Sequence, residues 1–528
     1  MRLSISRMCQ TSVFDMEVIN LYIEEQRSIA VQRKYDVIVC GGGIAGISAA
    51  LAAARCGSKV ALFEREYMLG GLGTAGLVTI YLPLCDGYGH QVSFGIAEEL
   101  LKLSIKDGAE ARYPANWLDG VGTRGEKDLR YEVQYNAQLF AILAEKLLLD
   151  SGVDILYGTY AVGVNMEGGK IRHIITENKS GRLAYEVGAV VDATGDCDIA
   201  HFAKAPTETF KQGNVLAAWY YYMGKDGYKL NMLGVCDIPD EEKNGENEVE
   251  ALMDRRFGGL DGEELSEQVC LSHKSTYNDF KKRRVSDPDI VPVTLATIPQ
   301  IRMTRRIVGE YELSEGEKFT RFEDSVGMVS NWKKRGPVYE VPFGTLYSKE
   351  IKNLICAGRC TSVDETMWDI MRVIPCCAVT GQASGTAAAM SDDFGTLDVS
   401  ALQKRLVADG DVLHLEDIGL KYDCGGGIVN MKTKSKLSSM LQCSLFAALL
   451  CVLSPLTIPV GAVPVSLGIF AVLLCSSVLG MRRSLVAVLV YIALGAVGLP
   501  VFAGWQGGFG VLAGPTGGIY GHIFPYAL

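Results

Sequence analysis

The sequence predicts an α/β protein built on a parallel sheet, with an inserted β-rich unit and an all-α, apolar C-terminal segment. Three observations lead to this fold class. A strand, a glycine loop, a helix and a second strand follow one another at residues 35–66, and apolar strand segments return at 189–192 and 353–357. Residues 437–528 contain no Asp, Glu or Lys and only two Arg, which is typical of membrane-embedded chain.

Composition separates an acidic soluble part from this uncharged segment. The 528 residues include 51 Lys and Arg against 61 Asp and Glu. Residues 1–436 hold 49 of those positive and all 61 of those negative side chains, a net charge of −12. A hydrophobic content of 48% supports a large core and excludes the disordered class. The acidic balance, with no basic cluster among aromatic residues, argues against nucleic-acid binding.

The cysteines predict reduced thiols and no metal site. The 15 Cys are scattered singly, apart from Cys356 with Cys360 and the adjacent pair Cys376 and Cys377. None of the spacings matches a zinc or iron–sulfur ligand pattern. The leader, residues 1–33, has acidic residues throughout instead of an apolar core, so it does not have the pattern of a signal peptide, and we assign it no function.

The first strong motif predicts a Rossmann-like dinucleotide-binding unit. Asp36–Cys40 reads as a buried strand, residues 47–54 as a helix, and Lys59–Phe63 as the next strand. Gly41, Gly43 and Gly46 between the first strand and the helix form G-x-G-x-x-G, and Glu64 ends the second strand.

Each residue of this motif has a specific physical role. Gly41 permits the tight turn, Gly43 lets the backbone approach a pyrophosphate, and Gly46 allows close packing of helix and strand. The helix N-terminus offers free N–H groups to the phosphates. Glu64 is placed to accept hydrogen bonds from ribose hydroxyls.

Further elements extend this unit. The glycine cluster at residues 69–76 would bring backbone close to a flat ligand, and the strand at 189–192 ends in Ala-Thr-Gly-Asp at a sheet edge where ligands bind. The pattern also predicts a helix over Glu132–Asp150, strands over 152–157, 160–165, 172–177, 185–187 and 353–357, and a small-residue helix over Ala378–Met390.

These elements predict a two-part nucleotide-binding domain around an insertion. The expected units are a leader (1–33), a first part of the dinucleotide-binding domain (34–206), an inserted β-rich substrate domain (207–345), a second part of the dinucleotide-binding domain (346–395), a connecting segment (396–436) and a transmembrane segment (437–528).

The assignment to FAD comes from a resemblance. The motifs at 36–64, 69–78 (LGGLGTAGLV), 191–200 (VDATGDCDIA), 302–313 (RMTRRIVGEYEL), 353–360 (NLICAGRC) and 372–389 (RVIPCCAVTGQASGTAAA) occur in order. Over residues 34–430 the chain resembles the FAD-dependent oxidoreductase family of the glutathione-reductase-like class, which includes relatives of the heterodisulfide reductase flavoprotein.

The resemblance implies a set of cofactor-binding residues. Gly41, Gly43, Gly46 and Glu64 would hold the diphosphate and the adenosine ribose of FAD. The residues implied along the flavin side, the ribityl region and the isoalloxazine end are Gly70, Gly71, Thr74, Thr194, Gly195, Asp196, Gly358, Arg359, Gly381 and Gln382. Two positions depart from the family pattern, because Cys197 and Lys204 stand where glycine is usual.

The C-terminal segment resembles a second family. Three apolar stretches, 437–453, 464–479 and 484–499, are nearly long enough to span a bilayer. With Pro and Gly motifs at 458–464, 499–504 and 514–518, they resemble the first half of the BioY family, the substrate-capturing membrane components of biotin transporters. Basic residues at 432–436 and 482–483 would lie on the cytoplasmic side, which puts the flavin domain in the cytoplasm at the cell membrane.

Few side chains are candidates for substrate chemistry. Arg302, Arg305 and Arg372 each offer a guanidinium that could hold a carboxylate or could pair with an acidic neighbour, so an anionic small-molecule substrate is one expectation. His90, and with less support His201, could carry a proton. Cys356 with Cys360, or Cys376 with Cys377, could form a redox pair, although core packing explains them as well.

The leading interpretation is an FAD-dependent oxidoreductase that transfers hydride to or from an unidentified small molecule and is tethered to the bilayer by its tail. Three alternatives stay open. The protein could be a heterodisulfide-reductase-like electron-transfer flavoprotein with an iron–sulfur cluster. It could be a biotin-uptake component that works with energy-coupling transporter subunits, although the tail matches only part of a transporter. It could also be an accidental fusion of two neighbouring genes.

Overall fold

A seven-stranded mixed sheet forms the centre of the α/β unit. The computed structural model describes residues 25–107, 132–236, 251–422, 428–460, 463–479 and 481–514. The strand order is β5-β2-β1-β8-β7-β6, with β18 also paired to β8. These strands are β1 (Ala30–Cys40), β2 (Val60–Phe63), β5 (Asp154–Leu156), β6 (Tyr160–Glu167), β7 (Lys170–Asn178), β8 (Gly181–Asp192) and β18 (Leu354–Cys356). Of the leader, residues 1–24 lie outside the described residues.

The unit predicted from the glycine motif is present. β1 and β2 are parallel neighbours, and α1 (Ile44–Arg55) connects them. Alternate residues of β1 enter two different cores, since Val37 and Val39 pack on one face of the sheet and Ile38 and Cys40 on the other. A parallel strand covered on both faces must be apolar on both, which explains its continuous apolar run.

β8 is one strand where the sequence predicted two. Gly188, which separated the two predicted segments, lies inside the strand, and a Cβ there would come within 2.7 Å of the Asp36 carbonyl oxygen of β1. The first half of β8 pairs antiparallel with β7, and its last three residues pair parallel with β18. One long strand therefore joins the antiparallel and parallel parts of the sheet.

Helix α7 (Ile374–Met390) packs closely against α1. A Cβ at Gly381 would lie 2.3 Å from the Ala45 carbonyl oxygen, and one at Gly385 would lie 2.1 Å from that of Ala49. The helix begins before the predicted Ala378 and holds a proline in its first turn, where proline is tolerated. Helix α3 (Ala137–Asp150) begins later than predicted, because Asn136 caps it by accepting a hydrogen bond from the Leu139 amide at 3.0 Å.

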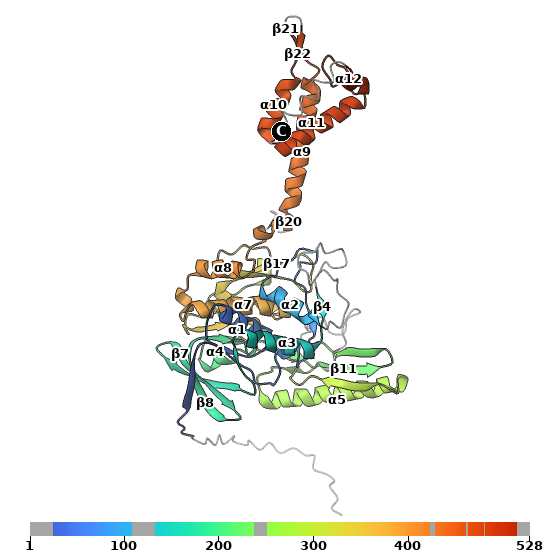
Figure 1. Ribbon diagram of the computed structural model, residues 1–528. Helices are drawn as coiled ribbons and strands as arrows, with labels where there is room; N and C mark the ends of the chain where they lie inside the picture. Colours follow the sequence, from blue (N-terminus) through green and yellow to red (C-terminus); the bar gives the residue numbers. More distant parts are fainter. Residues whose placement is uncertain are drawn as a thin grey trace, which may run out of the picture.

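The predicted insertion divides into two groups of elements. An antiparallel sheet, β12 (Gly227–Leu233), β11 (Ala218–Gly224) and β14 (Val291–Leu295), lies with α5 (Gly262–Ser286) along one side of the α/β unit (Figure 1). The hairpin of β16 (Ser325–Ser330) and β17 (Val338–Pro342) packs instead against α7 and belongs to the main core. The acidic stretch at 237–250 lies outside the described residues.

The remaining elements of this unit are short or peripheral. They are α2 (Ile96–Lys106), α4 (Asp198–Phe202), α6 (Glu365–Met371), α8 (Val399–Ala408), β3 (Ile80–Tyr81), β4 (Val133–Gln134), β9 (Thr207–Thr209), β10 (Asn214–Val215), β13 (Arg256–Phe257), β15 (Arg305–Ile307), β19 (Leu420–Tyr422) and β20 (Ile428–Asn430).

The C-terminal segment is mainly helical, but the prediction that it is all-α was wrong. It contains α9 (Met431–Leu453), α10 (Gly468–Leu479), α11 (Met481–Ala496), α12 (Phe509–Ala513) and a hairpin of β21 (Thr457–Val460) and β22 (Val463–Ser466). The second predicted stretch, 464–479, therefore begins as a strand. Pro459 and Pro464 face each other in this hairpin, and proline is unfavourable inside a helix.

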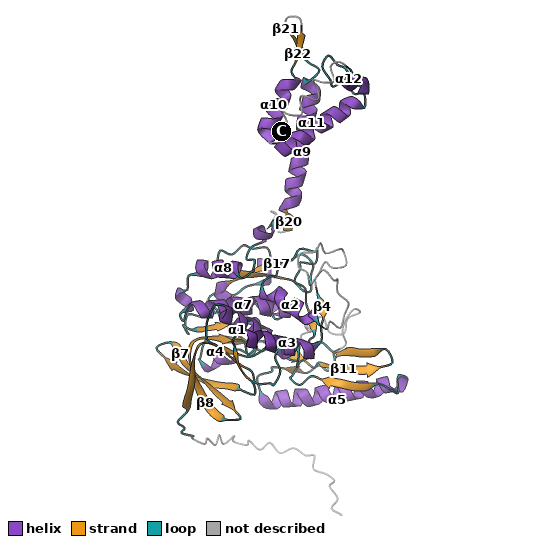
Figure 2. Cartoon of the chain, in the orientation of Figure 1, coloured by secondary structure: helices purple, strands orange, loops and turns teal. Residues whose placement is uncertain are grey.

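The helices of this segment enclose a small core of their own. Leu450, Val472, Val488, Tyr491 and Phe502 are buried against one another, and α9 leads away from the α/β unit towards them (Figures 1 and 2). Among the described residues, none of the helices combines the length and the apolar character needed to cross a bilayer.

Candidate active site

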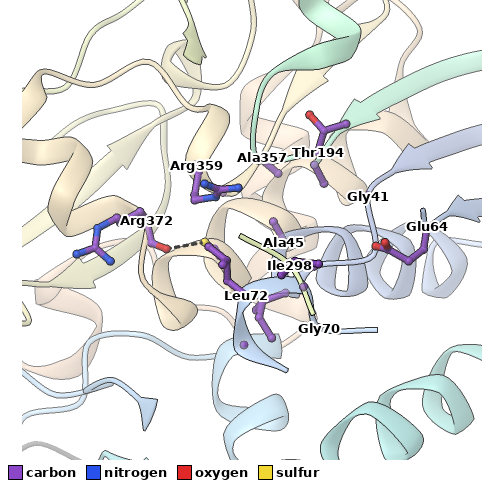
Figure 3. A pocket seen from close by; sticks show the side chains of 18 of the residues that line it. Gly41, Ala45, Glu64, Gly70, Leu72, Thr194, Ile298, Ala357, Arg359 and Arg372 are labelled. Atoms are coloured by element: carbon purple, nitrogen blue, oxygen red, sulfur yellow. Dashed lines mark hydrogen bonds between the residues drawn. The ribbon is translucent and has the colours of Figure 1, made fainter. Parts of the chain in front are cut away.

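An elongated cavity lies beside the predicted dinucleotide-binding motif. Its volume is about 1340 Å³ including the open mouth. Figure 3 shows Glu64 towards one end and Arg372 towards the other, with Gly41 and Ala45 between them. The predicted site residues that line it are Gly41, Gly43, Glu64, Gly70, Gly71, Thr194, Gly195, Arg302, Gly358, Arg359 and Arg372.

The three motif glycines differ in what surrounds them. Gly41 has φ +101°, a conformation open mainly to glycine, and a Cβ there would meet the Ala193 carbonyl oxygen at 2.4 Å. A Cβ at Gly43 would meet no atom within 4 Å, so the space beside it is free for a ligand. Gly46 lies outside the cavity lining, and a Cβ there would come within 1.8 Å of the Gly41 carbonyl oxygen. Its role in the structure is to let α1 pack on the loop.

Glu64 is held at the carboxyl end of β2. Its Oε2 accepts a hydrogen bond from the Gly42 amide at 2.6 Å, and its Oε1 accepts one from the Glu66 amide at 2.8 Å. Burial raises the pKa of this carboxyl, while the two backbone hydrogen bonds lower it. A carboxylate fixed in this way has lone pairs left to accept ribose hydroxyl groups.

The second glycine cluster lies directly against the first. The Gly70 amide donates to the Gly42 carbonyl oxygen at 2.8 Å, and Gly70 and Gly71 line the cavity next to Gly43. Thr74 does not line it, since its hydroxyl donates to the Leu69 carbonyl oxygen at 2.5 Å and its side chain is fully buried. Thr74 thus stabilises the loop, and its predicted ligand contact stays a prediction.

The end of β8 brings Thr194 and Gly195 to the cavity. Asp196 points away from the lining, where its Oδ1 accepts a hydrogen bond from the Thr304 hydroxyl at 2.9 Å. Asp198, which the sequence analysis did not single out, does line the cavity. Burial, with Asp196 and Asp192 nearby, raises its pKa to about 6.

Gly358 and Arg359 close the cavity beyond β18. Arg359 donates to the carbonyl oxygens of Ile301 and Arg302 at 3.0 and 2.8 Å. Gly381 and Gln382 lie on α7 behind the lining, where Gly381 contacts α1 and the Gln382 Oε1 accepts from the Ile96 amide at 2.7 Å. Neither residue lines the cavity, and their predicted contacts with the flavin end stay predictions.

The three candidate arginines differ in their partners. Arg305 donates to Asp198 Oδ1 at 2.8 Å and does not line the cavity. Arg372 lines the cavity, but its Nε donates to Asp369 Oδ1 at 2.9 Å. Arg302 also lines it, is 4% exposed, and has a buried Nη1 without a hydrogen-bond partner among the described residues.

Neither candidate histidine lies at the cavity. The Nδ1 of His90 lies 2.8 Å from Asp86 Oδ2, and this hydrogen bond raises the pKa of His90. His201 is exposed on α4. The structure therefore brings neither ring to the residues that line the cavity.

Three buried thiols gather behind the lining. The sulfur atoms of Cys197 and Cys356 are 3.9 Å apart, and the Cys197 amide donates to the Cys360 sulfur at 3.2 Å. Asp192 lies next to them, but its oxygens accept hydrogen bonds from Thr194 and from the Ala200 amide. Burial raises the pKa of the Cys197 and Cys360 thiols well above the usual range, so both stay protonated.

Cys376 and Cys377 diverge instead of pairing. Cys377 lines the cavity, and its thiol donates to the Arg372 carbonyl oxygen at 3.3 Å (Figure 3). Cys376 is buried in the main core.

An apolar wall of the cavity was missed by the sequence analysis. Val78, Ile80 and Leu82 line it together with Ile298. The first three alternate with Thr79 and Tyr81 directly after the second glycine cluster, and this period of two marks one face of an extended segment. That alternation was the available signal, whereas Ile298 carried none.

Two known families match this chain. Residues 36–218 and 215–406 match the family described as FAD dependent oxidoreductase, and residues 431–527 match the BioY family. The crystal structure of a geranylgeranyl bacteriochlorophyll reductase-like protein from Thermoplasma acidophilum aligns over 73% of this chain and 86% of its own, with 14% identity and a TM-score of 0.38.

Curated relatives match a short part of the chain. The chain is 50% identical over 84 residues to "Biotin transporter BioY2" of Lactococcus lactis subsp. cremoris (strain MG1363), which is 16% of this chain and 46% of that protein. It is 44% identical over 88 residues to "Biotin transporter BioY" of Thermotoga maritima, 16% of this chain and 52% of that one. The chain thus spans about half the length of the curated relatives that it matches.

Proposed function

The chain belongs to the FAD-dependent oxidoreductase family, and from this premise we propose that it transfers a hydride between its flavin and a small organic molecule bound in the cavity. One observation carries the proposal: glycine loops and strand ends from four distant parts of the sequence converge on a single elongated cavity. A site built from glycine loops and strand ends, with an apolar wall at one side, suits a cofactor and a substrate together.

We assign the cofactor-holding roles by position. Gly41, Gly43 and the N-terminus of α1 would bind the diphosphate, because free helix N–H groups favour anions. Glu64 would accept the adenosine ribose hydroxyls. The segments around Gly70, Gly195 and Gly358 would contact the flavin half. Bound FAD supplies the redox chemistry, since its ring accepts or donates a hydride.

The protein contributes position and a dry environment. Val78, Ile80 and Ile298 exclude water from the substrate side, and Asp198, with a pKa of about 6, can hold or release a proton at its carboxylate oxygen. The test is anaerobic mixing of the purified full-length protein with candidate hydride donors, including alcohols, amines, hydroxy acids and reduced nicotinamides. A donor within the true substrate class should bleach the flavin absorption.

A chemical reductant is the control in that screen. The hydride-transfer proposal fails if the chemical reductant bleaches the flavin but no hydride donor does, and if no candidate acceptor reoxidises the reduced flavin. Iron and labile sulfide are measured on the same sample, because an electron-transfer flavoprotein with an iron–sulfur cluster would contain both.

We also propose that the C-terminal segment anchors the protein in the cell membrane with the flavin domain on the cytoplasmic side. The match of 431–527 to the BioY family supports the anchor. So does the apolar outer surface of α9–α11, where Leu445, Phe470 and Val486 are exposed, since a surface of this kind marks a lipid or protein contact. The basic residues at 432–436 and 482–483 support the orientation.

The anchor can be tested by fractionation and by labelling. Full-length protein should sediment with membranes, while a 1–430 truncation should stay in the supernatant. Cys270 on α5 is exposed, so a membrane-impermeant thiol reagent should label it only after the cells are broken, with Cys270→Ser as the control. Labelling of Cys270 in intact cells would reverse the orientation, and sedimentation of the truncation would remove the anchoring role.

A second candidate function concerns biotin. The 50% identity to a biotin transporter favours biotin binding by the C-terminal segment, alone or with energy-coupling transporter subunits. Equilibrium binding of labelled biotin to detergent-solubilised full-length protein tests this. Saturable binding that the 1–430 truncation lacks would support it, and its absence would leave the oxidoreductase as the only proposed activity.

A further inference from the structure

Arg302 lines the cavity without an acidic partner among the described residues. Arg372 donates to the Asp369 carboxylate, and Arg359 lies 3.5 Å from Asp196. No carboxylate of the described chain lies within ion-pair distance of the Arg302 guanidinium, although the side chain is 4% exposed. A buried cation is costly unless an anion or several acceptors surround it. A buried arginine without an acidic partner therefore points to a bound anion that completes the site.

The backbone of Arg302 is fixed from two sides. Its amide donates to Asn214 Oδ1 at 3.0 Å, and its carbonyl oxygen accepts from Arg359 Nη1 at 2.8 Å. Asn214 is itself fully buried and donates to the Met303 carbonyl oxygen at 2.7 Å. These two hydrogen bonds hold the main chain of Arg302, so the start of its side chain has a defined position.

The guanidinium is fixed as well. It lies over the Trp219 ring, 5.1 Å from the ring centre, and the indole N–H of Trp219 donates to the Gly234 carbonyl oxygen at 2.8 Å. Stacking on an aromatic face orients the plane of a guanidinium without using its N–H donors. Arg302 is therefore preorganised, and its buried Nη1 has no acceptor among the described residues.

The cavity that Arg302 lines also has an apolar wall. Val78, Ile80, Leu82 and Ile298 line the same cavity and offer no hydrogen-bonding side chain. An arginine at an apolar wall suits a molecule with a hydrophobic body and one anionic group, since a planar carboxylate can accept two parallel hydrogen bonds from the guanidinium. The diphosphate of the cofactor is assigned to a different position, at Gly43 and the N-terminus of α1, so Arg302 is not needed to bind it.

We infer that Arg302 binds the carboxylate of the substrate, so that the enzyme acts on organic acids with an apolar body. The inference rests on the proposed function and deepens it, because it names the substrate class of the same cavity. Arg359 and Asn214 act as positioning residues through the Arg302 backbone, and Arg305 is excluded from this role by its pairing with Asp198.

Binding of benzoate and of benzamide, its uncharged counterpart, tests the inference. Titration calorimetry on full-length protein in detergent detects binding whether or not the preparation contains flavin, and the flavin spectrum reports it independently. We expect saturable binding of benzoate and at least tenfold weaker binding of benzamide. Arg302→Lys should weaken benzoate binding at least tenfold, because bidentate geometry is lost, and Arg302→Met should abolish it.

Arg305→Lys is the matched control, since its charge can still reach Asp198, and its benzoate affinity should stay within about twofold of the wild type. Equal binding of benzoate and benzamide, or unchanged benzoate binding by Arg302→Met, would overturn the inference. Loss of FAD from Arg302→Met would also overturn it, by assigning Arg302 to the cofactor. A wild type that binds benzoate but no FAD would instead contradict the proposed function.

Discussion

Two residues with positive φ coincide with the departures from the family pattern. Cys197 has φ +55° and Lys204 has φ +60°, and these are the two positions where the resemblance implies glycine. Glycine adopts this conformation without steric cost, whereas a residue with a Cβ does not. The departures in sequence thus coincide with strained backbone, and the strain flanks α4, next to the cavity.

Replacing Lys204 by glycine should stabilise the protein. Lys204 is exposed, and its amide donates to the His201 carbonyl oxygen at 3.0 Å at the end of α4, so glycine would keep the turn and relieve the strain. We expect the free energy of unfolding to rise by about 1 kcal/mol in urea titrations. Lys204→Ala removes the charge but keeps the Cβ, and an equal gain in that variant would attribute the effect to charge instead.

Asp411 should make stability depend on pH. It is buried, its Oδ2 has no hydrogen-bond partner among the described residues, and burial raises its pKa to about 7. Between about pH 4 and pH 7 the folded state therefore keeps a proton that the unfolded state has lost, so the free energy of unfolding falls as pH rises. The full effect is on the order of 4 kcal/mol, at about 1.4 kcal/mol per pH unit.

The asparagine variant isolates this effect from other carboxyls. Asp411→Asn cannot ionise, so its stability relative to the wild type should rise between about pH 4 and pH 7 and then level off. A constant difference between the two proteins across that range would show that Asp411 does not titrate as expected.

Glu64 should contribute to cofactor affinity through its carboxylate. Hydrogen bonds to a charged group are worth about 1.5–3 kcal/mol, so Glu64→Ala should weaken FAD binding by that amount. Fluorescence quenching on adding FAD to flavin-free protein measures it. Tyr67→Ala, three residues on in the same loop but outside the cavity lining, serves as the comparison, and an equal loss in both variants would argue for a general disturbance of the loop.

At the scale of elements, the contact of α1 and α7 fixes one wall of the cavity. Gly385→Ala would place a Cβ 2.1 Å from the Ala49 carbonyl oxygen, and overpacking of this kind costs about 1–3 kcal/mol. Urea unfolding measures the loss. Gly262→Ala at the start of α5 is the control, because a Cβ there meets no atom within 4 Å, and a stable Gly385→Ala would mean that the helices can separate without cost.

The sequence predicted these elements well wherever one local pattern decided them. The unit of β1, α1 and β2 followed from glycine spacing and an apolar run, and its cavity-lining glycines followed with it. Elements decided by distant contacts were less predictable. β8 is continuous through Gly188 because β1 packs there, and Gly381 and Gln382 face α1 and α2 instead of the cavity because α7 is covered on both sides.

The structure of the C-terminal segment was also only partly predictable from local sequence patterns. Hydropathy alone could not separate the hairpin of β21 and β22 from the helices around it, since all of these segments are apolar. The two facing prolines were the signal for a break. Likewise, sequence proposed three arginines for the substrate, and only the ion pairs in the folded chain separated Arg302 from Arg305 and Arg372.

For the whole molecule, two units of different character share one chain. The α/β unit is acidic and buries a large two-sided core, while the C-terminal helices have a small core and an apolar outer surface. The first unit carries the oxidoreductase family match and the second the BioY match. We thus assign the redox chemistry to the α/β unit and the anchoring to the C-terminal segment. Either part can be mutated or deleted without changing residues of the other.

The flavin content of the purified full-length protein shows whether the chain binds FAD. We expect about one FAD per chain in the wild type, visible as the yellow flavin absorption. Gly43→Trp should be folded and colourless, because its side chain would enter the space that the diphosphate needs. A wild-type protein that is isolated without flavin absorption and takes up no added FAD, or a Gly43→Trp variant that retains full FAD, would contradict the account.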